Sequence, residues 1–575
     1  MKKHFVYLLV FFIVSILKTN AQTITMPRIL GNNMVLQQNK QVPVWGWAVT
    51  GTSVTITASW DQTATAISDV NGRWQTTIQT PVAIAGEAPQ YTISVQGPVN
   101  TLTFSNILVG EVWLASGQSN MWLPMRWWKS FNQVEINAAN YPNIRMFMLY
   151  NKSTASTPQK DLPFGSWKVC NPVNVDSFSC IPYFFAKELY NNKALNIPIG
   201  IISVAYGGAS IPDFLSAEGI SGADATTIAY CSSYSKSQIF NSFIAPVIPY
   251  AIKGALWYQG EANYRGGSGY GNTQTALIKD WRKKWGYDFS FFAVQLAPYF
   301  RATTPVTKKD LNYVLPLFRE FQNTILNLSK TGIVVNADLM PDSAELYEIH
   351  PHRKLEVGQR LAALALANDY GQTVQCLGPT FLSKAVEANK IRISFKPETL
   401  GSGLNTKDGK NISNFRIAGS DNKFYPANAT IDGNTVLVWS DNVLLPTNVR
   451  YAFSDGAMTN LQNKEGFPAF PFRTDVLSGW TGATYIDIPY PVTGLNQFIE
   501  TKLKIYPNPF SSLLNIDNND LSIKSIEIMD VTGRKLNAKM ESNLSINTEN
   551  FKSGIYFLNI KLLSGESTST KLIKN

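Results

Sequence analysis

A serine lies in a short polar cluster between two apolar stretches of the sequence. The cluster is Gly117-Gln118-Ser119-Asn120, within VWLASGQSNMWLPM. A serine hydroxyl attacks a carbonyl when a base removes its proton and hydrogen-bond donors stabilise the oxyanion. Gly117 allows the backbone to approach a substrate closely because it lacks a Cβ. We therefore predict that Ser119 is a nucleophile, although most Gly-x-Ser motifs are ordinary turns.

Few histidines are present that could act as the base for this serine. The chain has three, and His4 lies in the N-terminal leader, which leaves His350 and His352 in the motif IHPH. Imidazole is the side chain whose ordinary pKa lies near neutral pH. Pro351 stiffens the turn before a helical stretch. We predict that His350 is the base and that His352 is a solvated residue of the first helical turn.

A base histidine is held in one tautomer by an acceptor on its far ring nitrogen. Two carboxylates compete for this role: Glu348, two residues before His350, and Asp338, which ends the strand-like stretch GIVVNAD. Glu348 is the first choice and Asp338 the second. A backbone carbonyl in their place would leave a Ser-His dyad, and Glu348 would then be a solvated loop residue.

Two further clusters could supply donors to an oxyanion. Gly207 and Gly208 lie in AYGGAS, and Gln259 and Asn263 lie in WYQGEAN. A backbone N–H at a glycine turn and a side-chain amide can both donate to a developing oxyanion. Taken singly, the glycines are equally typical of a tight turn, and the amides of hydrogen bonding within a loop.

These residues must be positioned by alternating strands and helices, which the sequence predicts over residues 107–385. Stretches such as ILVGEVWLASG, IPIGIISVAYGG and AIKGALWYQG read as strands, and SCIPYFFAKELYNNKAL and RKLEVGQRLAALALAND as helices. This alternation predicts a parallel sheet in an α/β layer. Ligands of such sheets bind beyond the carboxyl ends of the strands, and every polar cluster named above follows a strand.

The remaining segments have β character or none. Residues 22–106 alternate short strands with turns and predict a β-sandwich. Residues 386–475 predict a β-rich domain that completes the same region, residues 476–501 a linker, and residues 502–575 a separate β-rich module. The predicted fold class is thus multidomain, with one α/β domain and flanking all-β domains.

Composition limits the location and the partners of the chain. Residues 1–21 combine a basic start, an apolar core and a small-residue cleavage site, which is typical of a secretory signal peptide. No later segment is long and apolar enough for a transmembrane helix. The net charge of +10 is scattered without a basic stripe, so nucleic acid is not an expected partner. In an oxidising compartment the cysteines permit one or two disulfides, with Cys170 and Cys180 near enough in sequence to pair.

In order along the chain, EVWLASGQSNM, IPIGIISVAYGGASI, GALWYQGEANY and IHPHRKLEVGQRLA resemble the blocks of the sialate O-acetylesterase-like family of SGNH hydrolases. The resemblance covers roughly residues 22–475. It implies a flavodoxin-like α/β/α fold, removal of acetyl groups from sugars, and no metal or cofactor. It also assigns the nucleophile to Ser119, the base to His350, and the oxyanion hole to the Ser119 amide, Gly207 or Gly208, and Gln259 or Asn263.

The sequence departs from the pattern of this family at two places. The aspartate that many SGNH enzymes carry three residues before the histidine is Tyr347 here, and Asp342 lies earlier in the same loop. The residue after Met121, often acidic in relatives, is Trp122, and LPMRWW follows it. The second departure indicates an aromatic rim that stacks on sugars. Substrate contacts are predicted at four side chains of the matching blocks, Gln118, Asn120, Trp122 and Glu261.

The C-terminal module has motifs of its own. YPNPF, IMDVTGRKL and GIYFLNIKLLSGESTSTKLIKN resemble the C-terminal sorting domain of type IX secretion cargo from Bacteroidetes. The resemblance covers residues 502–575 and implies passage through the periplasm, contact with the type IX machinery, and a secreted or cell-surface protein. The alternative is an immunoglobulin-like adhesive module.

The function predicted from these features is that of a secreted carbohydrate O-acetylesterase with Ser-His catalysis and an acetylated glycan as substrate. One alternative is a sugar-binding protein that has lost catalysis, which the missing aspartate before His350 would favour. Another is a lipase or arylesterase on the same fold, for which the sequence shows no apolar acyl pocket. The sequence leaves open whether the sugar is sialic acid or part of a plant polysaccharide.

Overall fold

The computed structural model describes residues 23–149, 153–267, 269–300, 313–340, 345–475, 504–517, 523–530, 534–536, 539–541, 544–562 and 567–575. The chain divides into two compact units, residues 1–475 and 476–575. The predicted signal peptide and the predicted linker lie outside the described residues.

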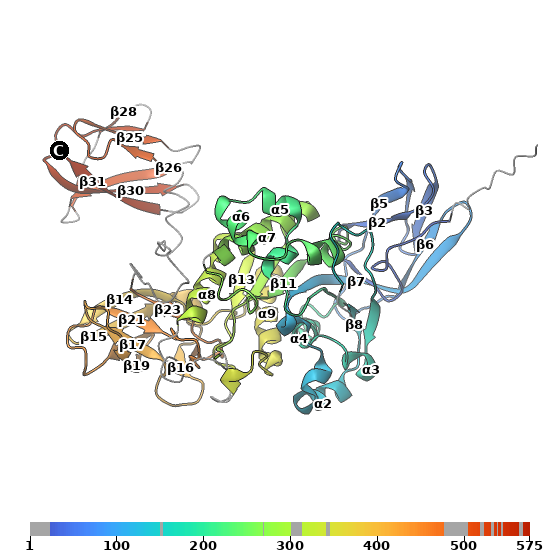
Figure 1. Cartoon of the computed structure of the whole chain (residues 1–575), viewed down its shortest axis with the longest axis horizontal. Helices are drawn as coiled ribbons and strands as arrows, with labels where there is room; N and C mark the ends of the chain where they lie inside the picture. The colour runs from blue at the N-terminus through green and yellow to red at the C-terminus, as the bar shows by residue number, and fades with distance from the viewer. Residues whose placement is uncertain are drawn as a thin grey trace, which may run out of the picture. The chain divides into compact units, whose positions relative to one another are not determined.

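Short strands separated by turns make up the N-terminal region of the first unit (Figure 1). They are β1 (Val35–Gln37), β2 (Gln41–Trp47), β3 (Ser53–Ala58), β4 (Gln62–Ile67), β5 (Arg73–Gln79) and β6 (Tyr91–Gln96). Strands β2 and β5 form one antiparallel pair, and β4, β3 and β6 form a sheet in that order. Buried Val54 and Ile56 alternate with more exposed neighbours, which places every second side chain in a core.

Strand β7 (Thr101–Gly117) belongs to both the N-terminal sheet and the central sheet. Its first half pairs antiparallel with β6, and the register shifts by one residue between the pairs Ile93–Phe104 and Tyr91–Ile107. Asn106 lies in this bulge with a φ of 55°, a conformation that asparagine tolerates well. Alternating exposure stops there, and every residue from Ile107 onward is buried. The predicted domain boundary at 106/107 therefore falls at a bulge within one strand.

The central sheet has the order β13-β12-β11-β7-β10-β8-β9 and is parallel except for its edge strand β9. The additional strands are β8 (Tyr141–Met148), β9 (Ser166–Cys170), β10 (Ile199–Ser203), β11 (Gly254–Tyr258), β12 (Ser290–Val294) and β13 (Thr331–Val334). Strands β10, β11 and β12 are buried throughout, as expected when both faces of a parallel sheet are covered. The predicted alternation of strands and helices around a largely parallel sheet is confirmed, and β14 (Phe381–Glu387) of the next region begins before the predicted boundary at 385/386.

Two groups of helices cover this sheet. The helices are α1 (Ser119–Trp122), α2 (Lys129–Ala138), α3 (Pro172–Val175), α4 (Cys180–Asn191), α5 (Ala217–Ser221), α6 (Ala225–Ser232), α7 (Gly269–Trp285), α8 (Val314–Gln322) and α9 (Lys354–Asp369), and short 3-10 turns include η1 (Met125–Trp128) and η6 (Glu345–Tyr347). Helices α4 and α9 pack on each other and on the sheet, and α5, α6 and α7 lie on its other side (Figure 1). A Cβ at Gly358 would lie 2.6 Å from the Phe184 Cβ, so glycine permits the close approach of α9 to α4.

A β-rich region follows α9. Its strands are β14 (Phe381–Glu387), β15 (Lys390–Phe395), β16 (Leu404–Thr406), β17 (Phe415–Ala418), β18 (Tyr425–Pro426), β19 (Asn428–Asp432), β20 (Thr435–Trp439), β21 (Asn448–Tyr451), β22 (Leu461–Asn463) and β23 (Phe472–Arg473). They form sheets in the orders β14-β15-β20-β19 and β18-β17-β21-β23 and a pair β16–β22. One apolar core joins Ile391 and Val436 of the first sheet to Phe415 and Tyr451 of the second.

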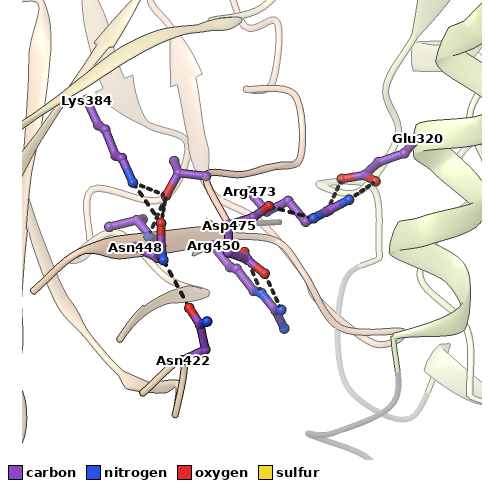
Figure 2. Close-up of polar contacts among 9 residues, drawn as sticks. Glu320, Lys384, Asn422, Asn448, Arg450, Arg473 and Asp475 are labelled. Carbon is purple, nitrogen blue, oxygen red and sulfur yellow. Dashed lines mark hydrogen bonds and ion pairs between the residues drawn. The ribbon is translucent and has the colours of Figure 1, made fainter. Parts of the chain in front are cut away.

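An ion pair connects this β-rich region with the α/β region, and a second one lies beside it. Figure 2 shows Arg473 of β23 directed at Glu320 of α8, with N–O distances of 2.9 and 3.2 Å. Arg473 also donates to the main-chain oxygen of Asp475, whose carboxylate pairs with Arg450 at 2.6 Å. These contacts bridge strands that follow α9 to a helix that precedes it, so the two regions pack as one unit.

The four cysteines form no disulfide. Cys170, Cys180, Cys231 and Cys376 are all free thiols. Cys170 ends strand β9 and Cys180 begins helix α4, where its sulfur accepts a weak hydrogen bond from Asn132 at 3.8 Å. The pairing of Cys170 with Cys180 that sequence proximity allowed is therefore absent.

The second unit contains two four-stranded antiparallel sheets, in the orders β24-β25-β29-β28 and β27-β26-β30-β31. The strands are β24 (Lys504–Tyr506), β25 (Leu513–Asp517), β26 (Ile523–Asp530), β27 (Lys535–Leu536), β28 (Lys539–Glu541), β29 (Ser545–Asn547), β30 (Gly554–Leu562) and β31 (Ser567–Lys574). Both sheets contribute to one core, with Leu514 and Ile546 from the first and Ile528, Leu558 and Leu572 from the second. Across the described parts of the chain, no helix is both long and apolar enough to cross a membrane.

Candidate active site

Ser119 lies where the central strand β7 ends and the short helix α1 begins. Gly117 has a φ of 131°, and a Cβ there would lie 2.2 Å from the carbonyl oxygen of Tyr258 on the adjacent strand β11. Glycine is thus required at this position, because any larger residue would collide with the neighbouring backbone. The Gln118 amide donates to the same Tyr258 oxygen at 2.9 Å, so the turn that presents Ser119 is fixed to the sheet.

The structure brings Ser119 and His350 together across a large separation in sequence. The distance from His350 Nε2 to Ser119 Oγ is 2.8 Å. When Nε2 accepts the hydroxyl proton, the ring proton of a neutral imidazole is on Nδ1. The pair therefore has the geometry that proton transfer from a serine to a histidine requires.

Glu348 lies beside the other nitrogen of this imidazole. Its Oε1 is 3.4 Å from His350 Nδ1 and accepts the His350 backbone N–H at 2.8 Å. The side chain is 48% exposed, so the carboxylate is only partly shielded from solvent. Tyr347, which has the position of the usual aspartate, is exposed.

Asp338 forms its ion pairs elsewhere. Both of its carboxylate oxygens accept from the Arg360 guanidinium at 2.7 Å, and Lys407 lies 3.1 Å from one of them. These cations hold the pKa of the buried Asp338 carboxyl below its ordinary value, although burial alone, the largest single effect, would raise it. Asp338 thus joins helix α9 to the β-rich region, and Asp342, the other carboxylate of the loop, lies outside the described residues.

The surroundings of His350 favour its neutral form. Burial lowers the pKa of the imidazole, the positive charge of Lys354 lowers it further, and Glu348 opposes both. A histidine with a pKa below its ordinary value is unprotonated at neutral pH and is free to accept a proton.

Two turns bring backbone amides that no other described group uses close to Ser119 in the structure. A Cβ placed on Gly207 would lie 3.8 Å from the Ser119 Cβ, so the Gly207-Gly208 turn lies directly against the serine. Within the described chain, no hydrogen bond uses the amide hydrogens of Ser119, Gly207 or Gly208. Gly208 adopts a φ of 80° in a largely exposed turn. These amides are available to an oxyanion formed at Ser119.

The two side-chain amides that were predicted as donors differ in their availability. Gln259 Nε2 donates to Gln118, to the Ala209 oxygen and to Asn263, at 2.7–3.1 Å, so both of its protons are engaged. Asn263 Oδ1 accepts from the Ile211 amide and from Gln259, which fixes the orientation of its amide group. Asn263 Nδ2 donates one proton to Tyr230 at 3.0 Å and retains the second. Of the two amides, Asn263 is therefore the one with a proton that no described partner uses.

Gln118, which was predicted to contact substrate, forms hydrogen bonds between two loops of the protein in this structure. Its buried side-chain oxygen accepts from Gln259 Nε2 and from the Gly260 and Ala262 amides at 3.1–3.3 Å. These bonds join the turn that carries Ser119 to the loop after β11. Gln118 thus holds two loops of the site together.

Asn120 connects the serine and histidine loops through a buried network. Its Nδ2 donates to Glu261 Oε1 and, at 3.0 Å, to the main-chain oxygen of Ile349, the residue before His350. Its Oδ1 accepts from Lys354 Nζ. One amide group therefore ties the residue after Ser119 to the residue before His350.

Lys354 was not identified from the sequence. It is the first residue of α9 and is 2% exposed, and its burial lowers the pKa of the ammonium to about 8. Burial raises the pKa of Glu261, whose Oε2 has no partner in the described chain. A lysine four residues after a catalytic histidine candidate, at a helix start, was the signal available in the sequence.

Trp122 and His352 are both partly buried, and His352 lies among aromatic side chains. Trp122 ends α1 and is partly exposed. The His352 ring stacks on Phe131 of α2, with ring centres 3.9 Å apart and planes 13° apart, so His352 is packed rather than freely solvated. Among the described residues, no cluster of three or more His, Cys, Asp or Glu side chains could hold a metal ion.

Two family models match the chain. Residues 109–367 match the model described as carbohydrate esterase, sialic acid-specific acetylesterase, and residues 504–575 match the secretion system C-terminal sorting domain. The sorting domain marks the protein for type IX secretion, to the cell surface or the medium.

Relatives of known name agree with the first match. Sialate O-acetylesterase of Homo sapiens is 26% identical over 60% of this chain and 70% of its own length, and that of Mus musculus is 24% identical over 74% and 88%. The crystal structure of a carbohydrate acetylesterase from Xanthomonas citri is 34% identical with a TM-score of 0.70, and covers 79% of this chain and 100% of that chain. The class of protein is thus that of the carbohydrate esterases. Within it, the chain belongs to the sialate O-acetylesterase-like family.

Proposed function

We propose that the chain is a secreted carbohydrate O-acetylesterase in which Ser119 is the nucleophile and His350 the general base. The observation that carries the proposal is the 2.8 Å contact between His350 Nε2 and Ser119 Oγ at the carboxyl edge of the parallel sheet. The sheet order and the two groups of helices support an SGNH-type, flavodoxin-like arrangement. The family membership supports an acetylated sugar as the substrate.

In the proposed reaction, Ser119 attacks the acetyl carbonyl while His350 takes the hydroxyl proton. The resulting oxyanion accepts from the amides of Ser119 and of Gly207 or Gly208 and from Asn263 Nδ2. His350 then gives its proton to the departing sugar alcohol, and an acetyl-serine remains. Water, activated by His350, attacks this ester and releases acetate, which restores the free serine. Glu348 orients the imidazole and stabilises its charged form.

We also propose that the functional divisions of the chain follow the segments predicted above, with the reacting groups confined to residues 107–385. Residues 22–106 and 386–475 flank that region within the first unit, and residues 502–575 form the sorting domain. Residues 1–21 act as the signal for entry into the periplasm.

The direct test of the proposed function is acetate release from a panel of acetylated substrates by the purified full chain. The panel contains O-acetylated sialic acid and partially acetylated xylan, mannan and pectin, together with 4-nitrophenyl acetate. Acetate release from at least one sugar ester is the expected result. An absence of release from every acetylated sugar, with binding retained, would instead support a sugar-binding protein without catalysis.

Replacing Glu348 with glutamine is expected to lower kcat by at least about tenfold. Loss of the acid in well-characterised triads costs roughly 10⁴, but the half-exposed Glu348 is screened by water and should contribute less. The control is Glu356→Gln in the first turn of α9, where the lost carboxylate pairs with Arg353 at the start of the same helix. If the two variants have the same kcat, the site works as a Ser-His dyad.

Replacing Asn263 with alanine is expected to lower kcat by roughly 10²–10³, the usual cost of losing one oxyanion donor. The KM for 4-nitrophenyl acetate should change little, since the lost bond forms mainly in the transition state. Tyr230→Phe is the matched control, because it removes the hydroxyl that accepts from Asn263 but leaves the amide in place. If Asn263→Ala has a wild-type thermal midpoint and its kcat stays within a few-fold of the wild-type value, Asn263 is not part of the oxyanion hole.

Replacing Lys354 with methionine is expected to move the acidic limb of the pH profile to higher pH. The charge of Lys354 lowers the pKa of His350, so its removal raises that pKa, while Glu348 continues to raise it as before. A base must be unprotonated, and activity is therefore lost as pH falls through its pKa. The measurement is the midpoint of the acidic limb of the pH profile of kcat/KM. The control is Lys407→Met, because Lys407 pairs with Asp338 and not with His350. A midpoint that stays fixed or moves to lower pH would contradict the assigned electrostatics.

A further inference from the structure

Exposed aromatic side chains are rare in the first unit and occur in two segments. Among the described residues 23–475, the exposed large aromatic side chains are Trp127, Phe131 and Tyr347, at 57%, 59% and 42%. Trp127 and Phe131 lie in η1 and α2, which follow the short helix of Ser119 along the chain. Tyr347 ends η6, three residues before His350. The exposed aromatics of this unit thus accompany the two residues of the proposed reaction.

Ring contacts tie the first of these segments to the second. Phe131 stacks on His352, two residues after His350, with ring centres 3.9 Å apart. Trp128, adjacent to Trp127, lies 6.1 Å from His352 and 6.3 Å from Phe131. The segment of η1 and α2 that follows Ser119 is therefore held against the loop that carries His350.

Exposed aromatic rings carry a free-energy cost that a bound partner removes. Such a ring buries about 150–250 Å² when fully covered, and exposed apolar patches commonly mark binding sites. The apolar C–H face of a sugar ring matches the face of an aromatic side chain in shape and polarity. More than one exposed ring beside a single nucleophile provides contact area for more than one sugar.

We propose that Trp127, Phe131 and Tyr347 form an aromatic platform that binds the sugar rings next to the acetylated one. The substrate is then an acetylated oligosaccharide or polysaccharide rather than a free acetylated monosaccharide. This inference rests on the proposed function and names the substrate class for that same site. The sugar chain is the occupant because two of the rings follow Ser119 closely in sequence, Phe131 stacks on the loop that carries His350, and Tyr347 belongs to that loop.

The first experiment compares chain lengths. Partially acetylated xylo-, manno- and galacturono-oligosaccharides are each compared with their acetylated monosaccharide, and kcat/KM is measured for the wild-type full chain. A preference of at least tenfold for one of the oligosaccharides is expected. Equal efficiency on monosaccharide and oligosaccharide in all three series would overturn the platform while the esterase assignment stands. An absence of acetate release from every sugar would overturn both.

The second experiment tests the named residues. In a Trp127→Ala/Phe131→Ala variant, and separately in Tyr347→Ala, the ratio of oligosaccharide to monosaccharide kcat/KM is expected to fall at least tenfold, mainly through KM. The control is Val134→Ala, which removes an 83% exposed apolar side chain from the same helix as Phe131 and should leave the ratio unchanged. The proposal would be overturned if the double variant and Tyr347→Ala both kept the wild-type ratio of oligosaccharide to monosaccharide kcat/KM.

Direct binding separates recognition from turnover. Calorimetry with the Ser119→Ala full chain and the preferred acetylated oligosaccharide should give a measurable Kd, and adding the two aromatic substitutions should weaken it at least tenfold. Light scattering on the same proteins tests the other occupant, a second copy of the chain. A dimer that the substitutions dissociate, with the oligosaccharide affinity unchanged, would assign the platform to self-association and overturn the proposal.

Discussion

Ser119→Ala is expected to abolish hydrolysis of 4-nitrophenyl acetate, with a loss of roughly 10⁴–10⁶ in kcat, the range seen when the nucleophile of a serine hydrolase is removed. The reason is that no acyl-enzyme can form without the hydroxyl that His350 Nε2 contacts at 2.8 Å. The backbone turn should persist, because it is fixed by Gly117 and by the Gln118 amide rather than by the Ser119 side chain.

The thermal midpoint of this variant should therefore remain close to that of wild type. Ser116→Ala is the matched control, since Ser116 also lies at the end of β7 but its buried hydroxyl donates only to the Val204 oxygen, at 3.4 Å. The control should retain most of the activity. A folded Ser119→Ala protein that works at near wild-type rate would remove the serine from the mechanism.

His350→Ala is expected to lose about as much activity as Ser119→Ala, because the members of such a pair act as a unit. Without the imidazole, the serine proton has no acceptor within hydrogen-bond reach, and the departing alcohol has no proton donor. The measurement is again kcat for 4-nitrophenyl acetate, a substrate too small to need the sugar-binding rim.

His352→Ala is the control for this second prediction. His352 shares the loop, but its ring stacks on Phe131, so its removal should cost less than tenfold on the small ester. If His352→Ala were inactive and His350→Ala active, the base would be His352. If both retained activity, the proposed Ser-His mechanism would fail.

The central fold could be predicted from sequence because its signals are local. Apolar runs such as those of β10 and β11 are buried on both faces, and the helical spacing of α4 and α9 follows directly from side-chain periodicity. The continuity of β7 could not be predicted in this way. The pattern does change at Ile107, but the change reflects a second covered face and a one-residue bulge rather than a loop between domains.

The site was predictable where a residue type is scarce or its motif specific. Ser119 and His350 meet as expected, since the chain has only two histidines after residue 21. The orienting acid was left open between Glu348 and Asp338, and only geometry separates them, because the Arg360 that holds Asp338 is distant in sequence. The position of Lys354, four residues after His350 and at the start of a predicted helix, was the signal that the sequence offered, but it does not show that the ammonium is buried.

The bulge at Asn106 makes one strand serve two sheets that are out of phase. Asn106 is held on both sides, donating to Asn33 at 2.7 Å and accepting from Arg145 at 3.2 Å. Since side chains alternate with a period of two, the extra residue resets which face each following side chain occupies. The number of residues from Asn106 to Ser119 therefore decides which way the side chains at the end of β7 point, because the strand is continuous up to Gly117. Inserting or deleting one residue in that interval would turn the side chains of the segment that presents the serine to the opposite face of the sheet. We therefore expect the length of the chain between the bulge and Ser119 to be constrained.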